Sequence, residues 1–152
     1  MSAILSNCFL LLIPIFLWNL FFSHKLEKVG YIISKVKFAK LDWLENILRA
    51  IVFIAPVFMN FNVSALSFTK YITLYVIGVT IYFISWLMVI YFPNSYWSKS
   101  ALGLLAPEYT YIAWLIAIGM LGNLKIYNYL AVLFVIVHTF STYFKLKIAK
   151  LK

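Results

Sequence analysis

Long apolar runs alternate with short polar segments along the chain, and these runs set the number of expected helices. A helix that crosses a hydrocarbon core of roughly 30 Å needs about 20 apolar residues at 1.5 Å per residue. Five stretches approach that length, at residues 4–22, 44–61, 71–92, 101–122 and 127–144. The pattern therefore predicts an all-α, polytopic integral membrane helical bundle with about five transmembrane helices.

The fourth stretch allows two interpretations. Residues 109–122 alone span about 21 Å at helical rise, which is short of the membrane core. Adding residues 101–106 gives one full span with Pro107 as an internal kink. In the alternative, a short helix and a re-entrant turn precede Pro107. Pro107 then takes the first position of the next helix, and the negative charge of Glu108 complements the dipole of that helix.

Residues 24–41 are too polar to cross and are expected to form a basic interfacial segment whose lysines reach toward headgroups. Hydrophobic residues make up 65% of the chain and charged residues 11%, against about 25% charged in a soluble domain. We therefore treat residues 1–152 as a single transmembrane domain. The first run lacks the basic region of a secretory signal peptide, so it is expected to remain as a helix.

The positions of the lysines along the chain predict the membrane topology and a lipid partner. With five spans, the lysine-rich segments at residues 24–41 and 145–152 fall on one side, which the positive-inside rule makes cytoplasmic. The N-terminus is then outside and the C-terminus cytoplasmic, in a membrane taken to be the bacterial cytoplasmic membrane. The net charge of +9 lies between and after apolar runs, which favours anionic lipid headgroups over nucleic acid. The lysines expected to contact headgroups are Lys25, Lys28, Lys35, Lys37, Lys40, Lys145 and Lys147.

The octet DWLENILR, residues 42–49, gathers two of the four acidic residues with the single arginine of the chain. Asp42 and Glu45 suit the first turn of a helix, and Glu45 and Arg49 are spaced for a local ion pair. This local explanation is sufficient in itself. A second interpretation notes that Arg49 shares a helix face with Asn46 and that its guanidinium fork suits a phosphate or carboxylate.

Other segments bring polar groups to a similar depth. We expect a polar cluster near the cytoplasmic side, formed by Arg49, Glu108 and His138, with Asn19, Asn46 and Ser85 as lesser members. Glu108 and His138 are the candidate catalytic pair, and Arg49, Asn46, Asn19 and Ser85 are the candidate ligand-binding residues. Simpler roles remain open, since His138 can join two helices by a hydrogen bond and Glu108 can be a helix-start charge.

Three functions fit these patterns. The chain has one cysteine, Cys8, and no motif for metal, nucleotide or nucleophilic chemistry, so no cofactor or metal site is expected. The favoured function is a non-enzymatic scaffold or accessory subunit with a protein partner or a second copy in the membrane. The alternatives are a small carrier or channel-like protein for an apolar or anionic molecule, and a lipid-modifying enzyme at the inner leaflet.

Overall fold

The computed structural model describes residues 6–34 and 38–149, and this part of the chain is helical apart from short connections. Cys8–Leu12 and Ala55–Phe58 are 3₁₀ segments, η2 and η3. A single antiparallel bridge pairs Asn7 with Asn60 within the described residues. The α-helices are α1 (Ile13–Ser34), α2 (Ala39–Ile54), α3 (Ala65–Tyr91), α4 (Tyr96–Lys99), α5 (Ala101–Leu104), α6 (Ala106–Tyr109), α7 (Tyr111–Leu121) and α8 (Lys125–Ala149).

Three of the described helical stretches are long and apolar enough to cross a membrane: Cys8–Lys25, Ala65–Tyr91 and Lys125–Ile148. The all-helical membrane architecture expected from the sequence is therefore supported, whereas five spans are not confirmed by this criterion. α3 begins before residue 71 and ends at Tyr91, whereas α8 begins before residue 127 and ends beyond residue 144. Ser64 explains the earlier start of α3, because its side chain caps the helix by accepting from Ser67 N–H.

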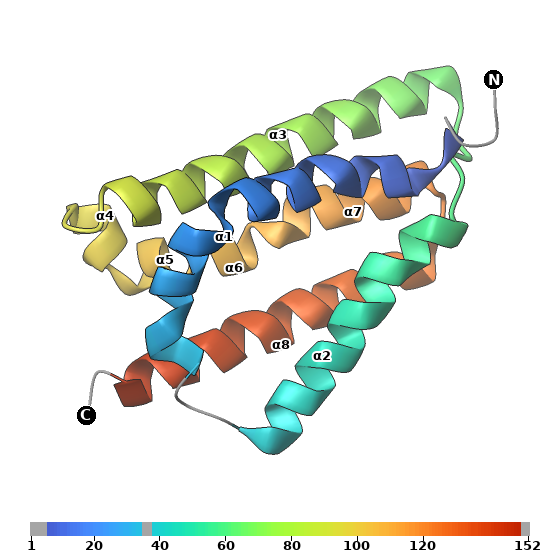
Figure 1. Ribbon diagram of the computed structural model, residues 1–152. Helices are drawn as coiled ribbons and strands as arrows, with labels where there is room; N and C mark the ends of the chain where they lie inside the picture. The colour runs from blue at the N-terminus through green and yellow to red at the C-terminus, as the bar shows by residue number, and fades with distance from the viewer. Residues whose placement is uncertain (1–5, 35–37, 150–152) are drawn as a thin grey trace.

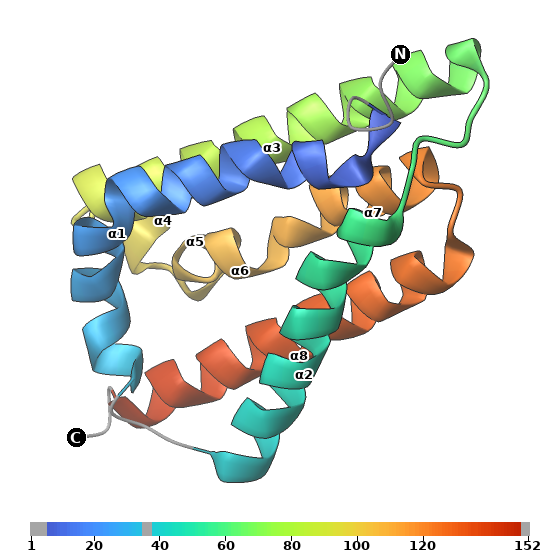
Figure 2. The same cartoon turned by 45° about the vertical axis from the view of Figure 1, so that its right-hand side comes forward.

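The first helix does not stop where the sequence becomes polar. α1 runs on from the apolar segment to Ser34, so residues 24–34 are a continuation of this helix and not a separate interfacial element. Lysine, glutamate and leucine are strong helix formers, which explains the continuation. In both views the C-terminal part of α1 turns away from α3 and approaches the C-terminal part of α8 (Figures 1 and 2). Pro14 is the second residue of α1, in the first turn, where proline costs little.

The second and fourth predicted spans are both interrupted. α2 ends at Ile54, and Pro56 follows within the 3₁₀ segment η3, because proline cannot donate the next helical hydrogen bond. The stretch 101–122 is divided into α5, α6 and α7, so it is not one kinked span. Pro107 lies in the first turn of α6 with Glu108 beside it, as in the alternative interpretation.

Two ends of the bundle can be defined by contacts between segments. At one, Cys8 N–H donates to Met59 O over 2.8 Å, and Asn62 N–H donates to Leu121 O over 2.9 Å. These bonds place the starts of α1 and α3 beside the ends of η3 and α7. We call this the Asn62 end.

At the opposite end, Lys25 Nζ donates to Tyr91 Oη over 2.7 Å, and Lys145 Nζ lies 2.6 Å from Asp42 Oδ1. We call this the Lys145 end. Between the two ends, α1, α3 and α7 lie together in one layer, and α2 crosses α8 in the other (Figures 1 and 2).

The core is densest where α3 meets α7. Gly78 allows this approach, because a Cβ added there would lie 2.8 Å from Trp114 N and 2.9 Å from Ala113 Cβ. The rings of Tyr82 and Trp114 are fully buried beside this contact, with their centroids 6.2 Å apart. A small residue that lets two backbones approach is the usual basis of helix packing in lipid.

Replacing Gly78 by valine should therefore push α3 and α7 apart and destabilise the protein by about 1–3 kcal/mol, the usual cost of overpacking. Thermal unfolding of the detergent-solubilised protein measures the change. Val76→Ala is the control, because Val76 is 55% exposed on the same helix and should have little effect. An unchanged Gly78→Val protein would contradict the tight contact.

Candidate functional site

A network of charged side chains lies at the Lys145 end, where α2, α6 and α8 meet. α2 contributes Asp42, Glu45 and Arg49, which are spaced by three and four residues and so share one face. α8 contributes His138 and Lys145, seven residues apart and again on one face. We call this set, together with Glu108 of α6, the ion network.

His138 is the centre of the ion network. Its Nδ1 lies 2.9 Å from Glu45 Oε1, and its Nε2 forms an ion pair with Glu108 Oε2. All three side chains are largely buried, with exposed fractions of 12% for His138, 8% for Glu45 and 13% for Glu108. Because both ring nitrogens face carboxylates, the imidazolium is the form that donates to both.

Aromatic rings hold the imidazole in place. Phe134, one turn earlier on α8, stacks on it with ring centroids 5.3 Å apart and planes 11° apart. Tyr111, the first residue of α7, meets it edge-on at 5.5 Å. The ring orientation is thus determined by packing as well as by the two carboxylates.

The outer members complete the charge balance. Arg49 forms an ion pair with Glu45 on the same helix, and its side chain is 46% exposed. Lys145 Nζ lies 2.6 Å from Asp42 Oδ1 and 4.0 Å from Glu45 Oε2. Three carboxylates therefore face an arginine, a lysine and an imidazolium, which gives a net charge of zero. Pairing of this kind is what allows charges to be buried.

The structure brings together three of the residues selected from the sequence. Glu108 contacts His138 directly, and Arg49 joins them through Glu45. Glu45 was expected only as a helix-start charge with a local partner, and Lys145 only as a headgroup contact. The sequence offered one indication of the extended network: residues 42, 45 and 49 are spaced so that they share one face of a helix.

The lesser members lie elsewhere. Tyr82 Oη donates to Asn19 Oδ1 over 3.4 Å, and Ser85 Oγ donates to Tyr82 O over 2.7 Å. Ser85 Oγ also lies 3.5 Å from Thr110 Oγ1. Asn46 is exposed, about 100° around the axis of α2 from the buried Glu45, and its side chain forms no hydrogen bond with the described residues. Asn19, Ser85 and Asn46 are therefore outside the ion network.

The lysines expected to meet lipid headgroups differ in their surroundings. Lys145 belongs to the ion network, and Lys25 donates to Tyr91 while its ammonium lies 4.2 Å from that ring's centroid. Lys40 and Lys147 are exposed. Lys35 and Lys37 lie outside the described residues, and only the backbone of Lys28, in α1, is described.

Residues 6–34 and 38–149 contain no group of three or more histidine, cysteine, aspartate or glutamate side chains arranged to hold a metal ion. The Cys8 thiol is buried and free at the Asn62 end, far from the ion network in the fold. Comparisons of the chain with protein-family models, curated proteins and solved structures gave no match.

Replacing Glu108 by glutamine should destabilise the protein by about 3 kcal/mol, because the shape is kept while His138 Nε2 loses its charged partner in a buried site. Denaturant unfolding in detergent, followed by circular dichroism, measures the loss. Arg49→Gln is the matched control. Its side chain is 46% exposed, and an exposed ion pair contributes about 1 kcal/mol or less. Equal stability of both variants and the wild type would rule out a structural role for the network.

Proposed function

We propose that the protein is a non-enzymatic accessory subunit of a membrane complex and that α2 binds a transmembrane helix of the partner. The observation that carries the proposal is the outward face of α2. There the amide of Asn46 lies among exposed apolar side chains. Trp43 is 67% exposed, Ile47 37% and Ile54 55%.

The proposal includes five crossings, with the Lys145 end in the cytoplasm and the Asn62 end outside. Residues 39–58, which comprise α2 and η3, number 20 and run from one end to the other. The segment from α6 to α7 also runs from the Lys145 end to the Asn62 end (Figures 1 and 2). Lysine-rich segments then share one side, in agreement with the positive-inside rule.

An amide that faces hydrocarbon leaves its donors and acceptor unsatisfied, which is unfavourable. A polar group on a neighbouring helix removes this cost, and such contacts contribute about 0.6–2 kcal/mol to helix association. Ala50 follows Asn46 by one turn and is also exposed, so a partner backbone can approach closely at that level. The face of α2 thus has the composition of a helix-binding surface.

The ion network supports a structural function over an enzymatic one. A general base needs a free ring nitrogen within reach of its substrate, whereas both nitrogens of His138 are engaged by Glu45 and Glu108. The carrier alternative needs a route between the two ends. At Gly78 the close approach of α3 to Trp114 and Ala113 fills the space between these helices, so a route would have to run elsewhere.

The topology can be tested with single cysteines in a protein whose buried Cys8 is replaced by alanine. A cysteine at position 62 or 123 should react in intact cells with a membrane-impermeant maleimide. A cysteine at position 99 should react only after the membrane is opened. Positions 62 and 99 reacting from the same side would contradict five crossings.

The partner surface can be tested by co-purification in mild detergent followed by mass spectrometry. Asn46→Leu and Ala50→Phe should each reduce recovery of a stoichiometric membrane partner at least tenfold, because one removes the hydrogen-bonding group and the other blocks close approach. Ile77→Phe is the matched control. Ile77 lies on α3 and is 52% exposed, so this variant should retain the membrane partner. A wild-type protein that purifies as a monomer, or only with a second copy of itself, would contradict an accessory role.

A further inference from the structure

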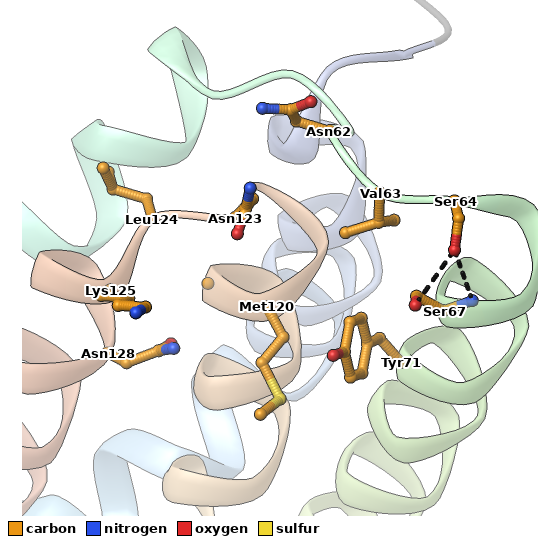
Figure 3. A pocket seen from close by; sticks show the side chains of 11 residues that line it. Asn62, Val63, Ser64, Ser67, Tyr71, Met120, Asn123, Leu124, Lys125 and Asn128 are labelled. Atoms are coloured by element: carbon orange, nitrogen blue, oxygen red, sulfur yellow. Dashed lines mark hydrogen bonds between the residues drawn. The ribbon is translucent and has the colours of Figure 1, made fainter.

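A polar cavity of about 420 Å³ lies at the Asn62 end, opposite the ion network. It is bounded by the loop before α3, the end of α7 and the start of α8 (Figure 3). Its polar lining residues are Asn62, Ser64, Ser67, Asn123, Lys125 and Asn128. The side chains of Asn128 and Tyr71 project toward its interior from opposite sides (Figure 3).

The backbone around the cavity is tied together by hydrogen bonds. Asn62 N–H donates to Leu121 O over 2.9 Å, which fixes the loop before α3 to α7. Leu124 N–H donates to Gly119 O over 3.0 Å, and Asn123 takes a left-handed conformation with φ of 51° in the turn between α7 and α8. These backbone hydrogen bonds between α7 and its neighbouring loops therefore fix the walls of the cavity.

Gly119 makes room for the amide of Asn128, because a Cβ at Gly119 would overlap Asn128 Oδ1. This oxygen is shielded from solvent and accepts no hydrogen bond from the protein. A buried acceptor left unpaired costs about 1–3 kcal/mol. The Asn128 side chain also lines the cavity, where its amide nitrogen can donate to a bound molecule.

The charge around the cavity favours a single negative charge. Lys125 is the cation in the lining, and no carboxylate is among the lining residues. Asp42, Glu45 and Glu108 are all engaged at the other end. Both α3 and α8 begin at the cavity, so their dipoles add to the positive potential.

The depth of the cavity indicates the source of the anion. α3 and α8 are two of the stretches long enough to cross the membrane, so their first residues lie at headgroup level. Val63, Met120 and Leu124 supply an apolar part of the lining. The cavity therefore suits a monoanion that has polar oxygen atoms and is joined to an apolar body.

We propose that this cavity binds the headgroup of an anionic phospholipid, with the phosphodiester near Lys125 and the amide N–H of Asn128 donating to a headgroup oxygen. A water-soluble glycerophosphodiester offers the same chemistry. The cavity is lined by α3, α7, α8 and their connecting loops and by no residue of α2, so the inference is independent of the partner surface on α2.

Native mass spectrometry of the detergent-solubilised protein tests the proposal with phosphatidylglycerol and phosphatidylcholine as probes. Phosphatidylglycerol should bind saturably and at least tenfold more tightly than phosphatidylcholine. Lys125→Gln should weaken it about tenfold by removing the cation. Asn128→Asp, which keeps the side-chain shape, should weaken it similarly by repulsion. Lys99→Gln, at an exposed lysine of α4 outside the cavity lining, is the matched control and should bind as the wild type does.

The unfolding curve of Lys125→Gln should match the wild type, because Lys125 is exposed and its side chain forms no hydrogen bond with the described residues. If glycerophosphoglycerol competes with the lipid, the site recognises the phosphodiester itself. If glycerophosphoglycerol does not compete while lipid binding is saturable, the site recognises the intact lipid. Equal retention of both lipids, or equal affinity in Lys125→Gln and Lys99→Gln, would overturn the proposal.

Discussion

The imidazole of His138, held between the carboxylates of Glu45 and Glu108, fixes the relative positions of three helices. Charges in a low-dielectric interior are costly unless each is paired, so this contact needs the right partners from α2, α6 and α8 at once. α6 has only four residues, too few to be stable as an isolated helix. Its position therefore depends on what Glu108 and its neighbours contact.

Much of the helical framework follows from simple sequence rules, but helix ends and interruptions do not. The apolar runs predicted where helices lie, because each run is long compared with a helical turn. Hydropathy alone ended the first helix near residue 22, whereas backbone hydrogen bonding continues it to Ser34. The division of residues 101–122 was harder to foresee, since Pro107 is compatible with both a kink and a first helical turn.

The candidate site shows the same limit more sharply. Depth along each helix, estimated from the rise per residue, grouped Arg49, Glu108 and His138, which the structure connects through Glu45. Depth does not give rotation about the helix axis. Asn46 was placed on the interior face with Arg49, yet the buried positions of α2 are Glu45, Leu48 and Val52. Leu48 and Val52 are apolar and pack in the core, and they decide which side of α2 is turned inward.

Glu45 was underestimated because its local pair with Arg49 explains it completely on one helix. Its second and third partners, His138 and Lys145, are 93 and 100 residues away in sequence, and no local pattern connects them. A local explanation that is sufficient can therefore hide a long-range role. Buried acids in a chain that has few of them are the positions where this matters most.

Charge is distributed very differently at the two ends of the bundle. The ion network takes three of the four acids of the chain and balances them with Arg49, Lys145 and the imidazolium of His138, so it adds nothing to the net charge. The positive balance rests on lysines outside it. Lys125 and His138 are 13 residues apart on α8, about 20 Å at helical rise. One continuous helix thus joins a charge network in which acids and cations balance to a cavity whose lining contains no acid.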